Sequence, residues 1–207
     1  MSGGMLLLLI VAVLIFSGLL QRVLDRMYLT DKQALLIIGL MLTGTFLPEV
    51  SMGSLRLNIG GGIIPIAVCI YLLVKADQPW ERWRSLLGSI LTATLVYALS
   101  TKMPAEAETM PFDPIWFYGP VGGIAAWLLG RSRRCAFICG IAGIILADTA
   151  SALLAWSKGY DVPLVLGGGG IADAAVISGV TAVLFCELLG EIIERFVRAW
   201  CERGKVH

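Results

Sequence analysis

Long apolar stretches that carry almost no charge constrain the fold of this chain more than any other feature. Runs of about 18 or more apolar residues can cross the hydrocarbon core of a membrane as helices. Only 15% of the 207 residues are charged, against about 25% in a typical soluble domain. The apolar segments are 4–20, 34–48, 59–74, 85–101, 114–130, 135–157 and 171–189. We therefore predict an all-α fold, a polytopic membrane protein with seven transmembrane helices.

The basic residues predict how these helices are oriented. Of the 16 Lys and Arg residues, all but three fall in the first, third and fifth connections and in the C-terminal tail. The second, fourth and sixth connections hold one each, namely Arg56, Lys102 and Lys158. Because basic residues favour the cytoplasmic side, we expect the N-terminus outside and the C-terminus in the cytoplasm. The first apolar segment lacks the basic start and cleavage site of a signal peptide, so we expect it to be retained.

The end of the chain predicts an amphipathic helix. We expect residues 1–190 to form a transmembrane helical domain and residues 191–207 a cytoplasmic tail. In the tail, Ile192 and Phe196 lie on one helical stripe, and Glu191 can pair with Arg195 on the other face. This pattern is typical of a helix that lies at the membrane interface. Docking of a partner protein is the alternative.

Composition limits the partners and cofactors. The net charge of +1 provides no basic surface for nucleic acid. All five cysteines lie in or beside apolar segments, where buried, reduced thiols are expected. The single histidine is His207, so a zinc site would lack its usual ligands. We expect no metal and no cofactor, and the expected partners are the lipid bilayer, a second copy of the chain in a homodimer, and a small cation or polar solute.

Two aspartates interrupt the apolar segments. A carboxylate deep in a membrane costs about 2.5–3.5 kcal/mol on insertion scales, so it indicates a functional site by default. Asp148 lies 14 residues after Arg134, and Asp173 lies 14 residues before Glu187. At about 1.5 Å per residue, both would sit roughly 21 Å above the inner boundary. We therefore expect the two carboxylates at one depth, in the outer half of the bilayer.

Glycine runs open the third and seventh apolar segments. Gly167–Gly170 directly precede Asp173, and the stretch "VPLVLGGGG" could re-enter the membrane as non-helical backbone that lines a wet cavity. Gly60–Val68 and Gly168–Val176 share six identities in nine positions, which indicates either a weak parallel internal repeat or a chance resemblance.

Depth counting places further residues near the two aspartates. Gly61 lies 14 residues before Lys75, which puts Gly61 at the expected depth of the two carboxylates. Tyr118 approaches the same layer, and the run "YGPVGG" that it begins would loosen the fifth helix there. The candidate binding residues are therefore Asp148, Asp173, Gly60, Gly61, Gly62, Gly168, Gly169, Gly170, Asn58 and Tyr118.

A purely structural interpretation of the same residues stays open. Small residues let membrane helices approach closely, so the glycines could serve packing alone. Asp148 could accept a hydrogen bond from Thr149, and Asp173 could cap its own helix, where a carboxylate suits the helix dipole.

Several motifs together resemble a known family. They are "LLIIGLMLTGTFLPEV", "LNIGGGIIPIAVCIYLL", "GIILADTASALL" and "GGGGIADAAVISGVTAVL". In this order, from Leu35 to Leu184, they resemble an uncharacterised family of bacterial and archaeal membrane proteins, the domain of unknown function 1614. The resemblance implies a prokaryotic source and a multi-pass location in the cell membrane. It implies no activity.

The aspartates also resemble, more distantly, those of presenilin and signal peptidase-like intramembrane aspartyl proteases. Those enzymes place one aspartate on each of two consecutive helices, the second after a glycine motif. Here Ala147 precedes Asp148 where they have tyrosine, and Ala172 precedes Asp173 where they have glycine. Their Pro-Ala-Leu motif is missing from this sequence.

Three functions follow from these features, and whether the chain is an enzyme stays open. The first is permeation or transport of a small solute, a cation or a proton at Asp148 and Asp173. The second is a structural or assembly role without catalysis. The third is intramembrane diaspartyl proteolysis, in which Asp148 and Asp173 would share a proton and activate water. We favour the first.

Overall fold

The computed structural model describes residues 9–13, 24–25, 27, 29–76, 78–102, 115–130, 132–170 and 173–203. Of the first predicted span, 4–20, it describes residues 9–13, which are helical. The other predicted spans each coincide with a helix. The helices are α3 (Asp31–Thr45), η1 (Ile59–Ile63, a π-helical turn), α4 (Ile64–Val74), α5 (Pro79–Lys102), α6 (Ile115–Gly130), α7 (Arg133–Ser157) and α8 (Ala174–Arg203). The all-α prediction is confirmed, apart from three short strands.

Length and apolar character separate these helices. Within the described residues, α7 and α8 are long and apolar enough to cross a membrane, whereas the apolar stretches Ile59–Val74 and Tyr118–Leu129 are shorter. Seven spans and their orientation therefore stay predictions.

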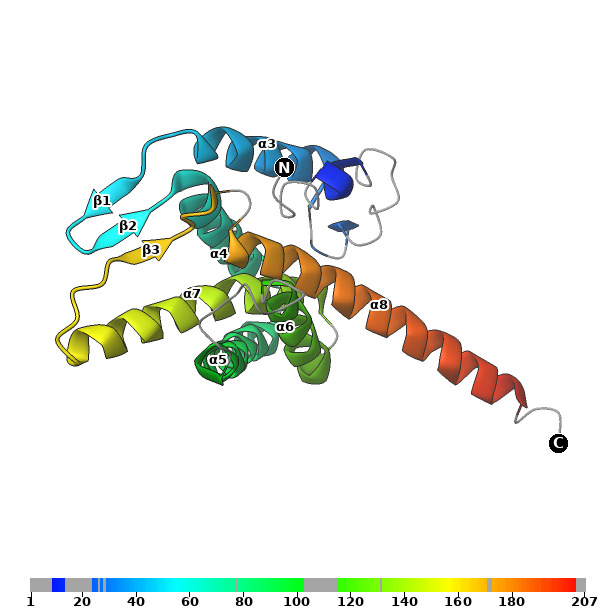
Figure 1. The fold of residues 1–207 in the computed structure, drawn as a ribbon. Coiled ribbons are helices and arrows are strands. Elements are labelled where there is room, and N and C mark those ends of the chain that lie inside the picture. Colours follow the sequence, from blue (N-terminus) through cyan, green and yellow to red (C-terminus); the bar gives the residue numbers. More distant parts are fainter. Residues whose placement is uncertain are drawn as a thin grey trace.

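Three strands form a small sheet that the sequence did not predict. Strands β1 (Val50–Met52) and β2 (Leu55–Leu57) pair as an antiparallel hairpin, with Gly53 in its turn at φ 63°. Strand β3 (Leu164–Leu166) pairs with β2 in parallel, with Leu55 opposite Leu164. Figure 1 shows the sheet at the left of the molecule, between the end of α3 and the C-terminal half of α7.

Helices α5, α6, α7 and α8 pack into a bundle through small residues (Figure 1). A Cβ atom at Gly140 of α7 would lie 2.7 Å from the Ser178 carbonyl oxygen and 2.8 Å from the Gly179 Cα atom. A Cβ atom at Gly122 of α6 would lie 3.0 Å from the Gly140 Cα atom. Such separations are shorter than real Cβ contacts, so these glycines let the three backbones approach closely.

The expected loosening of the fifth predicted helix is wrong. Residues Ile115–Gly130 form one helix with Pro120 inside it. A Cβ atom at Gly119 would lie 2.5 Å from the Thr181 Cβ atom, and one at Gly123 would lie 2.9 Å from the Ala182 carbonyl oxygen. The glycines of α6 therefore serve close packing on α8, and neighbouring helices stabilise a helix that contains proline.

Helix α5 has polar side chains inside and large apolar ones outside. Ser85, Ser89 and Thr92 are at most 2% exposed, whereas Leu87 and Ile90 are 55% and 57% exposed. The hydroxyls of Ser85, Ser89 and Thr92 each donate to the backbone carbonyl four residues earlier. Their hydrogen bonds are thus satisfied within the helix, and the small side chains can face α7.

Charged residues tie α5, α7 and α8 together at one level, which we call the ionic layer: Glu81, Ser132, Arg133, Arg134 and Glu187. Arg133 pairs with Glu187 and so joins α7 to α8. The Glu81 carboxylate of α5 accepts a 2.6 Å hydrogen bond from Ser132 and lies 3.3 Å from the Arg134 guanidinium.

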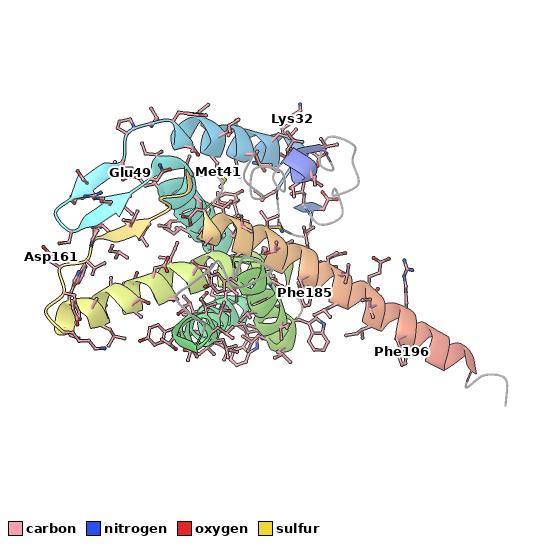
Figure 2. The ribbon with its side chains drawn as sticks, in the orientation of Figure 1. Lys32, Met41, Glu49, Asp161, Phe185 and Phe196 are labelled. Carbon is pink, nitrogen blue, oxygen red and sulfur yellow. The ribbon has the colours of Figure 1, made fainter. Side chains whose placement is uncertain are left out.

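Helix α8 continues far past the ionic layer. It runs as one helix from Ala174 to Arg203 and projects away from the bundle (Figure 1). The boundary expected at residue 190 therefore does not interrupt the helix, because a single glycine costs a helix only about 1 kcal/mol. The projecting part is amphipathic: Leu188 and Phe196 are exposed, and Arg195 pairs with Glu191 at 2.6 Å (Figure 2).

Candidate functional site

Two strands lead into the two glycine runs and then into two helices. Strand β2 is followed by Gly60–Gly62 and α4, and strand β3 by Gly167–Gly170 and α8. The parallel pairing of β2 with β3 starts both runs side by side. The two units therefore have the same order and direction, which favours the internal repeat over a chance resemblance. Leu57 pairs with Leu166 whereas Gly60 aligns with Gly168, so the first unit holds one extra residue between its strand and the aligned glycines.

The two glycine runs pack backbone against backbone. A Cβ atom at Gly61 would lie 2.6 Å from the Gly167 carbonyl oxygen and closer still to that of Gly170. A Cβ atom at Gly62 would lie 2.8 Å from the Leu166 carbonyl oxygen. Gly167 and Gly170 also have φ values of 74° and 59°, which L-residues rarely adopt. We call this contact the glycine junction.

Helix α3 completes the glycine junction. A Cβ atom at Gly60 would lie 2.5 Å from the Thr45 backbone nitrogen, and one at Gly170 would lie 2.9 Å from the Thr45 Oγ1 atom. Gly44 faces Gly60 in the same way. Beside this contact, the buried Met41 side chain packs on Val176 of α8 (Figure 2). Gly44 and Met41 were not among the residues predicted from the sequence; the small-residue run at 43–45 was the available signal.

Asn58 links the two units. Its side-chain Oδ1 accepts a 3.1 Å hydrogen bond from the Gly61 N–H and so caps η1. Its backbone N–H donates to the Leu166 carbonyl at 3.0 Å. Asn58 is buried, and both observed roles are structural.

Asp173 caps α8. Its two carboxylate oxygens accept hydrogen bonds from the backbone N–H groups of Ala175, at 2.9 Å, and Gly169, at 3.2 Å. The Asp173 carbonyl accepts the first helical bond, from Ile177. This geometry is that of an N-cap residue, whose carboxylate also suits the helix dipole. Asp173 thereby ties the last glycine turn to the helix, as the structural interpretation expected. Gly168 is exposed, and a Cβ atom there would meet the Val165 side chain.

Asp148 has different surroundings. It is exposed on α7 and lines an open groove of about 290 Å³, with Ser151 and Ala155 on the same helix and Val162–Val165 opposite. The Thr149 hydroxyl donates to the Ile145 carbonyl at 2.7 Å, so it is not the partner of Asp148. Within the described residues, no hydrogen bond to the Asp148 carboxylate is found.

The helix register brings the two aspartates to the same end of the α7–α8 pair. The Arg133–Glu187 ion pair fixes the register at the ionic layer. Asp148 is almost as far along α7 from Arg133 as Asp173 is from Glu187 on the antiparallel helix.

Tyr118 lies near the start of α6. Its half-buried side chain packs against the main hydrophobic core, which includes Ala147 and Ala175, near neighbours of the two aspartates in the chain. The described residues contain no group of three or more His, Cys, Asp or Glu side chains that could hold a metal ion.

Comparison with protein families gives one match, to a protein of unknown function (DUF1614), over residues 20–185. Comparison with the curated proteins and with the solved structures gives no match for the chain.

Proposed function

The chain belongs to the DUF1614 family, and we propose that this member is a multi-pass cell-membrane protein that binds and passes a small cation or a proton at Asp148. The observation that carries the proposal is an exposed carboxylate on α7, a helix long and apolar enough to span a membrane. In lipid, such a residue marks an ion pathway or proton relay by default.

The inverted face of α5 supports the membrane location. In water, burying a leucine or isoleucine side chain contributes about 1.5–3 kcal/mol, so exposed Leu87 and Ile90 beside buried Ser89 would forgo that stabilisation. In lipid, the tails are as apolar as leucine, and small residues instead form the helix contacts. The polarity of α5 therefore matches a helix that faces lipid.

Length supports the same placement. The 25 residues of α7 span about 38 Å at 1.5 Å each, which exceeds a hydrocarbon core of about 30 Å. The ionic layer would then lie at the cytoplasmic boundary, consistent with the N-outside, C-inside orientation expected from the basic residues. Asp148 would lie roughly 22 Å from that layer, in the outer half of the bilayer.

The two aspartates would have different roles. Asp148 faces the groove and would carry the ion, whereas Asp173 is held by two backbone N–H groups and would act as a fixed negative charge. The hydrogen bonds of Asp173 count against diaspartyl proteolysis, because that mechanism needs both carboxylates to exchange protons with substrate and water. Seven helices are few for a transporter, so we expect a homodimer.

A structural or assembly role is the second candidate, and the glycine junction favours it. Asn58, Asp173 and several glycines join α3, α4 and α8, and the Asn58 Oδ1 atom and both carboxylate oxygens of Asp173 are engaged by backbone N–H groups rather than left for a ligand. In that case Asp148 would be incidental, and no ion flux would depend on it.

Ion flux in proteoliposomes tests the proposal. Purified protein is reconstituted with a pH-sensitive dye, and proton, Na⁺ and K⁺ gradients are applied in turn. We expect flux above that of empty liposomes, loss of flux in Asp148→Asn, and retention in Asp161→Asn, a matched change at an exposed loop aspartate. Flux that is absent from the wild type, or unchanged in Asp148→Asn, would overturn the proposal; absence would favour the structural role.

A further inference from the structure

Two buried thiols lie in contact outside the aspartate region. Cys135 and Cys139 are one turn apart on α7, their sulfur atoms are 3.7 Å apart, and they are 2% and 0% exposed. Cys139 Sγ also lies 3.7 Å from the Ser85 carbonyl oxygen of α5.

Helix α5 leaves room for both sulfur atoms. A Cβ atom at Gly88 would lie 3.9 Å from Cys135 Sγ and 3.0 Å from Leu129 Cδ1. Cys139 Sγ would be the nearest of the three atoms, and the Cβ atom would clash with it. Glycine at this position therefore leaves room for the Cys139 sulfur atom against α5. Other small residues of α5, Ser85 and Ser89, flank it.

A polar cavity leads to the thiol pair from the ionic layer. The cavity has a volume of about 130 Å³ and is lined by Gln78, Trp80, Glu81, Arg84, Leu129, Ser132 and Cys135. Gln78 and Trp80 are exposed, whereas Cys135 is buried, so the cavity runs from the surface to the first thiol. Arg84 provides a positive charge in its wall, stacked 5.5 Å from the Trp80 ring.

From this geometry we propose that Cys135 and Cys139 bind one Cu(I) ion. Thiolates are soft ligands that select Cu(I), zinc and iron–sulfur clusters among the common metals. At a metal–sulfur bond of about 2.3 Å, sulfurs 3.7 Å apart subtend roughly 107° at one shared ion. A two-coordinate Cu(I) ion prefers its two sulfurs nearly opposite each other, about 4.6 Å apart at that bond length. Both thiols can therefore bind the same ion once their sulfur atoms move apart by roughly 0.9 Å.

The number of ligands selects among soft metal ions. A structural zinc site needs four ligands, and the described residues contain no group of three or more candidate side chains. Cu(I) is stable with two or three ligands. Binding replaces two thiol protons by one Cu(I), so two protons leave to the solvent and the site gains one negative charge. Arg84, in the wall of the adjoining cavity, offsets that charge.

Disulfide formation explains the pair less well. It would need the sulfur atoms to approach from 3.7 Å to about 2.05 Å across one helical turn, together with an oxidant. The ionic layer faces the cytoplasm in the proposed orientation, where thiols are kept reduced.

Competition for Cu(I) tests the site. The full-length protein in detergent is titrated anaerobically with Cu(I) against a chromophoric chelator. We expect one tightly bound ion per chain, and a loss of at least about 100-fold in affinity in Cys135→Ser and in Cys139→Ser. Cys69→Ser removes a buried thiol on α4 and should keep wild-type affinity. Equal affinity in all variants would overturn the proposal.

If a serine variant fails to fold, X-ray absorption spectroscopy of the Cu(I)-loaded wild type tests the site instead, because it identifies the atoms that bind the copper. Two sulfur scatterers at a thiolate bond length would support the site, and oxygen or nitrogen scatterers alone would overturn it.

Discussion

Four glycine-to-alanine substitutions separate the two reasons for which the glycine junction needs glycine. Gly61 has an ordinary backbone conformation but no space for a Cβ atom, whereas Gly159 has a φ of 84° and open space around it. Gly167 has both restrictions. Its φ is 74°, and a Cβ atom there would lie less than 3.0 Å from backbone atoms of Gly61 and Gly62. Gly39, in the middle of α3, has neither.

The structure fixes the expected order of stability. Gly39→Ala should stabilise the protein by about 0.5–1 kcal/mol through helix propensity. Gly159→Ala should cost about 1–2 kcal/mol because alanine is strained at positive φ. Gly61→Ala should cost about 3 kcal/mol, the upper part of the overpacking range, since the crowded atoms are backbone oxygens that cannot rotate away. Gly167→Ala combines both penalties, about 4–5 kcal/mol.

Thermal unfolding with a thiol-reactive fluorogenic dye measures the series. Four cysteines, Cys69, Cys135, Cys139 and Cys186, are buried, so their reaction with the dye should rise sharply on unfolding. For a protein of this length, 1 kcal/mol shifts the Tm by roughly 2–4 °C, so Gly61→Ala should lower it by about 6–12 °C. A Gly61→Ala variant as stable as Gly159→Ala would refute the backbone contact between the two glycine runs.

Three further predictions concern the cap, the ionic layer and the orientation. Asp173→Ala should lower the stability by about 1 kcal/mol and Asp173→Asn by only a few tenths, because asparagine is an equally good N-cap; equal loss in the dye assay would contradict the capping role. In a double-mutant cycle with Arg133→Gln and Glu187→Gln, the ion pair should show a coupling free energy of about 1–2 kcal/mol, which lies between the values typical of exposed and of buried salt bridges. A coupling free energy of zero would mean that this ion pair does not join α7 to α8. A reporter fused after His207 should be cytoplasmic and one inserted within 103–112 external, and the reverse result would disprove the orientation.

The sequence predicted the helices well because their information is local. Apolar runs and flanking charges determined six helix positions, and Thr30 and Gln33 form a capping box at the start of α3. The strands were missed because a strand as short as Leu55–Leu57 is too short to show the alternation of apolar and polar residues by which strands are recognised. Its pairing with Leu164–Leu166 joins segments separated by about half of the chain, which no local pattern reports.

The candidate site was predicted in part. The two glycine runs do meet in space, but through backbone atoms, and a contact between residues without side chains leaves no hydrophobic or charge pattern in the sequence. Asp173 joins the second run through its carboxylate. Asp148 was singled out by its place in an apolar segment, and the structure places it on the apolar helix α7; its role as a site residue stays a prediction. The groove opposite it is built by Pro163 and Val165 of a returning segment, and the position of that segment depends on the distant pairing with β2.

The parallel pairing of β2 with β3 has a consequence for biosynthesis. Leu55 leaves the ribosome well before its partner Leu164, because about half of the chain is made between them. At a synthesis rate of roughly 5–20 residues per second, that interval is about 5–22 s. Throughout it, one edge of β2 has no partner, and lipid cannot hydrogen-bond that edge. The nascent chain must therefore keep this segment in water or against a temporary protein partner, and a chain that stops before residue 164 would carry an exposed strand edge permanently.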